Sequence, residues 1–318
     1  MSTATLNTSE IALEKTSIAI IKTLLYFNIF NHPLLVSEIV EFSTIEHDEI
    51  SNVEQYLNEL VEKELIYKIG QFYSISNKVL YADRRIKGNE QAAIYLKRAK
   101  IVSRVISWFP FVRGVMISGS LSKGYMDKGS DIDYFIVTEQ SRLWVCRSIL
   151  ALFRKIIVGS LRKYFCINYF VSTATLNIPD KNLFTATEIV SVYPTYGQLT
   201  YYKLQQENSW VKEYFPNKKT NEITINNSSY PFSIKAAIEF LLKGNIGEKL
   251  DAYLFSLMLK RWKKRYADFD ETQFDLNIRT KKNVSKQHEK GHQFVILHKF
   301  MEQIDNFEKL HKVKLVHG

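Results

Sequence analysis

Cysteine, proline and glycine are all scarce in this chain of 318 residues, which has 2 cysteines, 6 prolines and 12 glycines. So little glycine and proline excludes a collagen-like or low-complexity chain, and a hydrophobic content of 46% is enough to build folded cores. The length fits two domains, or one large domain with an appendage. Cys146 and Cys166 have neither metal-site spacing nor the number needed for a disulfide framework, so we expect free thiols, with Cys166 buried.

Long apolar runs are also missing. No stretch of about 18 uncharged apolar residues occurs, so we expect no membrane span. The segment MSTATLNTSEIALEK lacks the apolar core of a signal peptide, and a cytoplasmic protein is therefore the expectation. The stretch LFSLMLKRWKKRY is typical of a basic amphipathic helix, which either lies on an anionic membrane or, as we expect, packs on a neighbouring domain.

The net charge of +10 is unevenly distributed along the chain. Residues 37–69 carry nine acidic side chains against two lysines, whereas residues 78–163 carry seventeen basic against six acidic side chains. Phosphate contacts supply most of the nonspecific affinity for DNA, so an acidic segment is a poor DNA reader. Nucleic acid is therefore a possible partner of the basic central region, but it is not the favoured one.

Apolar spacing predicts three helices and a β-hairpin between about residues 17 and 76, an arrangement typical of a winged helix. We expect this segment to contact a protein or to support the fold. A basic helix follows over residues 79–108, with Ile94, Ile101, Val105 and Ile106 on its apolar side.

The central region predicts an α+β unit with a mixed sheet. Strands are expected at 115–118, 134–137 and 166–173, with one long helix over 141–165. The rest, from about residue 182, is predicted to be mostly helical. We therefore expect a winged-helix-like domain at 1–78, a central core at 79–180 and a helical region at 181–318.

Residues 115–138 read VMISGSLSKGYMDKGSDIDYFIVT. Two aspartates at i and i+2 of a strand share one face, and Mg²⁺ prefers carboxylates together with phosphate oxygens and water. A Gly-Ser turn brings backbone N–H groups and a hydroxyl against phosphate. The spacing therefore predicts a metal–phosphate site at Asp131 and Asp133 behind Gly119 and Ser120. Further donors nearby are Ser122, Lys123 and Ser130, and the Lys123 ammonium is a charge partner for phosphate.

This arrangement resembles the nucleotidyltransferase superfamily that includes DNA polymerase β. Its signature, an apolar residue, Gly, Gly or Ser, about a dozen residues and then Asp-x-Asp or Asp-x-Glu in a strand, is matched by residues 117–120 and 131–133. The resemblance covers residues 115–172. It looks closest to small bacterial proteins that carry a nucleotidyltransferase domain, an N-terminal winged-helix-like segment and a C-terminal helical segment.

The resemblance implies transfer of a nucleoside monophosphate from a nucleoside triphosphate such as ATP to an acceptor hydroxyl. Asp131 and Asp133 would be the catalytic ligands of Mg²⁺ or Mn²⁺. Gly119 and Ser120 would hold the β- and γ-phosphates, with Lys123 and Ser130 nearby. The acceptor is open: a small molecule, a sugar derivative or a protein side chain.

One position departs from the family pattern. Active members usually carry a third carboxylate on the strand after the crossover helix, and Asn168 occupies that position here. An amide oxygen can ligate a metal, but it neither acts as a base nor adds charge. Either Glu188 substitutes, although a surface glutamate is the preferred interpretation, or the site holds one metal, or catalysis is impaired. The alternative function is therefore a catalytically impaired nucleotide-binding or regulatory protein that contacts a protein partner through its winged-helix-like domain.

Overall fold

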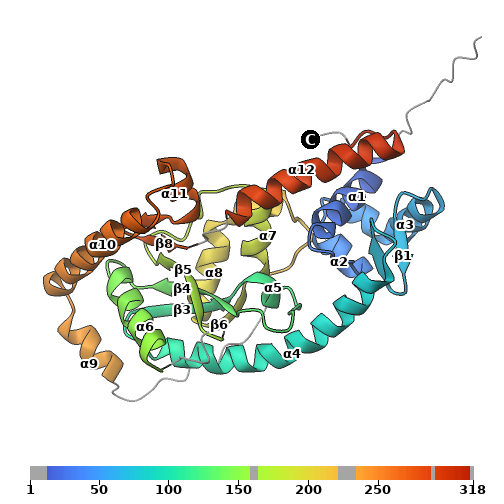
Figure 1. The fold of residues 1–318 in the computed structure, drawn as a ribbon. Coiled ribbons are helices and arrows are strands. Elements are labelled where there is room, and N and C mark those ends of the chain that lie inside the picture. Colours follow the sequence, from blue (N-terminus) through green and yellow to red (C-terminus); the bar gives the residue numbers. More distant parts are fainter. Residues whose placement is uncertain (1–12, 158–163, 221–233, 288–290, 316–318) are drawn as a thin grey trace, which may run out of the picture. The chain divides into compact units, whose positions relative to one another are not determined.

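The computed structural model describes residues 13–157, 164–220, 234–287 and 291–315 (Figure 1). The chain divides into two compact units, and neither is continuous in sequence. Unit 1 comprises Met1–Arg85, Lys212–Lys219 and Gln293–Gly318, and unit 2 comprises Ile86–Val211 and Thr220–His292. The last helix of the chain therefore belongs with the N-terminal segment.

Unit 1 contains the three helices and the hairpin that apolar spacing predicted. Its N-terminal elements are α1 (Lys15–Asn28), α2 (Val36–Glu41), a 3₁₀ turn η1 (His47–Asn52), α3 (Val53–Glu62), β1 (Tyr67–Ile69) and β2 (Phe72–Ser74). The hairpin turns at Gly70, whose φ of +59° is readily adopted by glycine. Helix α12 (His292–His311) completes the unit, and its Gln303 accepts a hydrogen bond from Asn28 at 2.9 Å.

Unit 2 is built on a six-stranded mixed sheet with the order β6-β3-β4-β5-β8-β7. Only β4 and β5 run parallel, and all other neighbours are antiparallel. The strands are β3 (Val112–Ile117), β4 (Asp133–Thr138), β5 (Cys166–Ser172), β6 (Tyr193–Tyr196), β7 (Thr280–Lys281) and β8 (Val284–Lys286). The structure therefore confirms an α+β fold with a mixed sheet.

Helices cover both faces of this sheet (Figure 1). The helices of this unit are α4 (Val79–Ser107), which begins in unit 1, α5 (Gly119–Ser122), α6 (Leu143–Ile157), α7 (Leu183–Ser191), α8 (Gln198–Glu207), the 3₁₀ turn η3 (Ser209–Glu213), which ends in unit 1, α9 (Ile234–Leu241), α10 (Asn245–Arg265) and α11 (Glu271–Asn277). Within the part of the chain that the structure describes, no helix has both the length and the apolar character needed to cross a bilayer.

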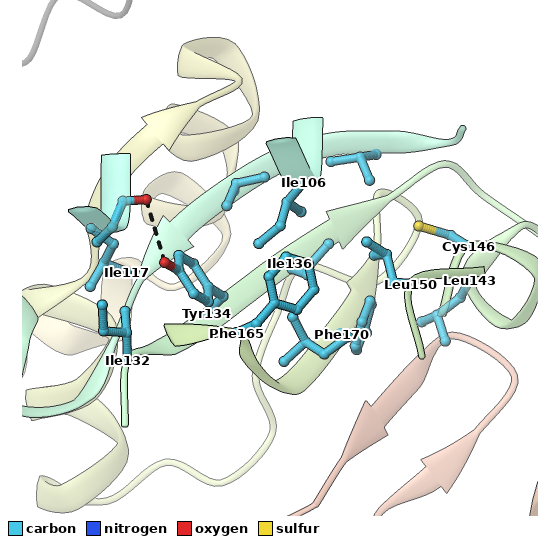
Figure 2. Close-up of a cluster of buried hydrophobic side chains, with 14 of the residues drawn as sticks. Ile106, Ile117, Ile132, Tyr134, Ile136, Leu143, Cys146, Leu150, Phe165 and Phe170 are labelled. Atoms are coloured by element: carbon cyan, nitrogen blue, oxygen red, sulfur yellow. Dashed lines mark hydrogen bonds between the residues drawn. The ribbon is translucent and has the colours of Figure 1, made fainter. Parts of the chain in front are cut away.

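The main core contains side chains from α4, α6 and the sheet. Figure 2 shows some of them, among them Ile106 of α4, Leu150 of α6 and Ile136 of β4. Tyr134 and Ile136 of β4 and Ile132, just before this strand, contribute side chains to this core. The Tyr134 hydroxyl donates to the backbone oxygen of Ala99 at 3.4 Å. Tyr134 is almost fully buried, so this bond gives its hydroxyl a partner away from water.

The prediction of the inner face of α4 was only partly right. Ile106 is buried, but Ile94 and Ile101 are exposed. The face that packs on the sheet carries Ala92, Tyr95 and Ala99, and two alanines allow the helix axis to approach the sheet closely. Large side chains alone therefore pointed to the wrong side of this helix.

The region after residue 182 was predicted to be mostly helical, and three short strands were missed. Pro194 lies in β6, where the missing N–H is tolerated because β6 is an edge strand. Strands β7 and β8 are only 2 and 3 residues long and carry no apolar alternation. The predicted helix over 141–165 corresponds to α6, but residues 158–163 lie outside the described residues.

Helix α10 is fixed to the start of α6 by one buried carboxylate. Asp251 accepts hydrogen bonds from the backbone N–H groups of Trp144 at 2.7 Å and Val145 at 2.9 Å. The first N–H groups of a helix have no partner within the helix, so this side chain from another helix supplies one. Trp262 packs in the same core from a position three turns further along α10.

Candidate functional site

The Gly-Ser turn and the first residue of β4 are in direct contact. The backbone N–H of Ser118 donates to the backbone oxygen of Asp133 at 3.0 Å, which extends the β3–β4 pairing to the turn. Gly119 follows with a φ of +68°, and a Cβ atom placed on it would lie 2.8 Å from Oδ2 of Asp133. Both the backbone angle and the carboxylate therefore require glycine at this position.

Helix α4 holds the loop that follows the turn. The backbone N–H of Met126 donates to the oxygen of Gly88 at 3.1 Å, and the Tyr125 ring fills the space beside Gly88. A Cβ atom at Gly88 would lie 2.2 Å from that ring, so a larger residue here would force the Tyr125 side chain to move. The sequence gives no local signal for Gly88, because its contact is with a loop more than 30 residues away.

The two aspartates occupy different environments. Strand β4 begins at Asp133, and Asp131 is an exposed residue before it, so only one of the two lies within the strand. Ile132 and Tyr134 are buried in the core beneath α4 and α6, and alternation along the strand turns Asp133 to the opposite face of the sheet. Ser120 lies in α5 and its side chain is exposed, and Ser130 lies in the loop just before Asp131.

Asn168 reaches Asp133 because strand β5 contains a β-bulge. Tyr134 pairs with Ile167 and Phe135 pairs with Tyr169, which leaves Asn168 as an extra residue opposite β4. The Asn168 amide donates to Oδ1 of Asp133 at 3.4 Å and contacts the Cys166 sulfur at 3.0 Å. The ring of the next residue, Tyr169, packs on Phe135 on the same face. The bulge thus places two consecutive side chains on the same face of the sheet, and the first of them, Asn168, contacts Asp133.

Burial raises the pKa of Asp133 to about 6. A hydrogen bond from the Cys166 thiol and the Lys123 ammonium oppose this rise, whereas the carboxylates of Glu188 and Asp131 add to it. Burial, together with the Asp133 charge, also raises the pKa of the Cys166 thiol to about 12, so this buried cysteine is a neutral hydrogen-bond donor at neutral pH.

Lys123 and Glu188 form an ion pair beside Asp133. The Lys123 ammonium donates to Oε1 of Glu188 at 2.7 Å and to the backbone oxygen of Gly119 at 3.1 Å. Glu188 comes from α7, on the face of the sheet towards which Asp133 points. The sequence favoured a surface glutamate here; the structure instead gives Glu188 a cation partner and places it close enough to Asp133 to influence its pKa.

The structure therefore brings together Gly119, Lys123, Asp133 and Asn168, which the sequence singled out, with Glu188, which the sequence offered as a substitute carboxylate. It adds Cys166. Across residues 13–157, 164–220, 234–287 and 291–315, no three His, Cys, Asp or Glu side chains are arranged to hold a metal by themselves. Asp131 and Asp133 can supply two carboxylates, which is the usual protein contribution when Mg²⁺ also binds the phosphates of a substrate. The donor set thus fits a metal that arrives with a nucleotide.

Comparisons of the chain with protein-family profiles, with curated proteins and with solved structures find no match.

Proposed function

We propose that unit 2 is a metal-dependent nucleotidyltransferase. It would bind a nucleoside triphosphate with Mg²⁺ or Mn²⁺ and transfer the nucleoside monophosphate to an acceptor hydroxyl. The observation that carries this proposal is the environment of Asp133: a buried carboxylate with a raised pKa, packed against the Gly-Ser turn and surrounded by further carboxylates. Such a site favours a cation, because a cation stabilises the ionised form that burial disfavours.

The metal would neutralise phosphate charge and align the reacting oxygen. Asp131 and Asp133 would hold it, and Asn168 would keep Asp133 in place through its amide N–H. Gly119 leaves room for phosphate oxygens close to the backbone, and Ser120 offers an exposed hydroxyl. In the transfer, a bond forms between the acceptor oxygen and the α-phosphorus, the bond to the leaving pyrophosphate breaks, and the proton of the acceptor hydroxyl is released to solvent.

Lys123 would exchange partners when the nucleotide binds. Its ammonium pairs with Glu188 in the free protein, and a triphosphate offers a stronger concentration of negative charge at the same place. Lys123 has three donors, so it can contact phosphate without leaving the carbonyl of Gly119. We place this activity in the cytoplasm, where two buried free cysteines remain reduced.

Calorimetric titration of each of the four ribonucleoside triphosphates, with and without Mg²⁺, tests the proposal. We expect one nucleotide to bind only with Mg²⁺, and the Asp131→Ala/Asp133→Ala variant to lose at least tenfold in affinity. The matched control is Glu207→Ala/Asp268→Ala, which removes two exposed carboxylates of unit 2 elsewhere and should bind as the wild type does. Metal-independent binding, or binding that survives in the Asp131/Asp133 variant, contradicts the proposal.

A second candidate function follows from Asn168. Its amide donates to Asp133 and Cys166, and an amide cannot serve as a base. The protein would then bind the nucleotide without efficient turnover and act as a regulator, with the winged-helix-like arrangement of unit 1 contacting a protein partner. An Asn168→Asp variant separates the two: raised turnover with unchanged nucleotide affinity supports impaired catalysis, and no gain favours the transferase as it stands.

A further inference from the structure

Helix α10 has one buried side and one exposed apolar side. Asp251 and Trp262 are buried where α10 packs on α6. On the other side lie four exposed side chains at spacings of four, three and four residues, which we call the α10 stripe: Ile246, Leu250, Tyr253 and Leu257. Ile246 is 70% exposed and Tyr253 is 64% exposed, so the stripe is not the margin of the core.

The stripe continues into basic residues on the same side of the helix. At 3.6 residues per turn, Lys264 lies five full turns after Ile246, and Lys260 and Arg261 lie on either side of that line. In total α10 carries six basic residues and two acidic ones, and one of the acidic pair, Asp251, is buried. Within the described residues, no carboxylate forms an ion pair with Lys260, Arg261 or Lys264.

Apolar residues extend from the stripe onto α9. Phe240 and Leu241, at the end of α9, are both exposed and precede α10 by only three residues. Helix α4 also exposes isoleucines, but Ile86, Ile94 and Ile101 stand seven to eight residues apart and form no comparable stripe. Helix α10 thus carries an exposed surface that is both apolar and basic, and two more exposed apolar side chains lie a few residues before it in the chain.

We propose that this surface, the α10 stripe with its basic end, binds the face of an anionic lipid bilayer. Interfacial helices combine these properties: apolar side chains enter the boundary between headgroups and acyl chains, and lysines and arginines contact anionic headgroups. Tyr253 suits that boundary, since its ring is apolar and its hydroxyl is polar.

Other occupants fit less well. A nucleic acid would match the basic residues but would leave the exposed isoleucine and leucines without a partner. A second copy of this chain would bring two strongly basic helices together, which like-charge repulsion disfavours. The proposed contact does not depend on nucleotide chemistry, and it needs no rearrangement of the side of α10 that packs on α6.

Co-sedimentation of the full chain with vesicles tests this inference. Vesicles of phosphatidylcholine containing 30% phosphatidylserine are compared with vesicles of phosphatidylcholine alone, at about 0.1 M and 0.5 M salt. We expect binding to the anionic vesicles only, weakened at the higher salt because headgroup attraction is screened. Failure of the wild-type protein to bind anionic vesicles at low salt overturns the proposal.

Two independent sets of variants separate the charged and apolar parts. Lys260→Gln/Arg261→Gln/Lys264→Gln removes three charges and should weaken binding roughly 100-fold, since each basic residue near the surface contributes about a factor of five. Leu250→Ser/Tyr253→Ser/Leu257→Ser should weaken it at least tenfold while keeping every charge. The control Lys97→Gln/Lys181→Gln/Lys203→Gln removes the same charge from exposed positions elsewhere in unit 2 and should bind anionic vesicles as the wild type does, to within about threefold.

The remaining outcomes point to other occupants and overturn the proposal. If the serine variant keeps full vesicle affinity and a random duplex DNA competes with the vesicles, the surface is an electrostatic nucleic-acid site. If sedimentation velocity shows a wild-type dimer that the serine variant abolishes, the surface is an interface between copies. Equal loss in the lysine control means that net charge alone drives the binding. Thermal melts of all three variants should match the wild type, because every substituted side chain is exposed.

Discussion

Asp133 and Asp180 of unit 2 are both largely removed from water, but these two carboxylates are satisfied in opposite ways. Arg279 donates two hydrogen bonds of 2.8 Å to the two oxygens of Asp180, and the Lys286 ammonium lies 3.8 Å away. Asp133 receives a 3.4 Å bond from an amide and a bond from a thiol, and its closest charged neighbours include two further carboxylates.

This difference separates a structural carboxylate from a candidate site. A buried charge is tolerated when a paired, hydrogen-bonded partner offsets its desolvation, which Arg279 does for Asp180. At Asp133 the chain leaves that desolvation uncompensated, and the pKa rises to about 6. A cation from outside the chain would therefore stabilise the ionised carboxylate of Asp133 more than that of Asp180.

The largest predicted effect is on the satisfied carboxylate. Arg279→Met leaves Asp180 buried without its bidentate partner, so we expect a loss of about 3 kcal/mol or more in the free energy of unfolding. Urea titration followed by tryptophan fluorescence measures unit 2 alone, because all four tryptophans lie in it. Lys281→Met is the control: it removes an exposed ion pair with Asp275 and should cost less than about 1 kcal/mol. Similar losses for both variants would contradict the comparison.

The next prediction concerns pH. Because the pKa of Asp133 is raised in the folded state, the folded protein binds the proton more tightly than the unfolded chain, and stability falls as pH rises from about 3.8 to about 6. Asp133→Asn removes this loss. We expect the variant and the wild type to be equally stable near pH 3.5, and the variant to be up to about 3 kcal/mol more stable at pH 7.

The measurement is the difference in free energy of unfolding between variant and wild type across that pH range. Asp180→Asn should behave in the opposite way and lose stability at pH 7, since it breaks the pair with Arg279. If the difference in unfolding free energy between Asp133→Asn and the wild type does not change with pH, the desolvation of the Asp133 carboxylate is already offset by its neighbours, and the prediction is wrong.

The smallest effect isolates the contact between the turn and the carboxylate. Gly119→Ala and Gly124→Ala both place alanine at a positive φ, +68° and +72°, which should cost about 1 kcal/mol in each case. Only at Gly119 does the new Cβ meet the Asp133 carboxylate, and we expect a further loss of about 1–2 kcal/mol there. Equal unfolding free energies for the two variants would show that the turn or the Asp133 side chain moves away from the new Cβ atom at no cost, which contradicts the prediction.

Local signals in the sequence predicted much of unit 2. Apolar runs located β3, β4 and β5, and the Gly-Ser and Asp-x-Asp pairs located the end of the sheet where Gly119 and Asp133 meet. The missed features depend on partners far away in the chain. Glu188 lies 65 residues from Lys123 in the chain, and the sequence around neither residue predicts their ion pair. The packing face of α4 was misassigned because alanines, not isoleucines, allow the close approach to the sheet.

The extra residue in β5 has a consequence for how this strand tolerates change. Ile167 and Phe170 both face the core although they are three residues apart, so the alternation along the strand changes phase between them, at the extra residue Asn168. Deleting Asn168 would leave the core residues on both sides in step with each other and would remove only the side chain that reaches Asp133. A one-residue deletion in β5 would therefore remove the side chain that contacts Asp133 and keep the core-facing side of the strand continuous, so the candidate site could be lost without a change of fold.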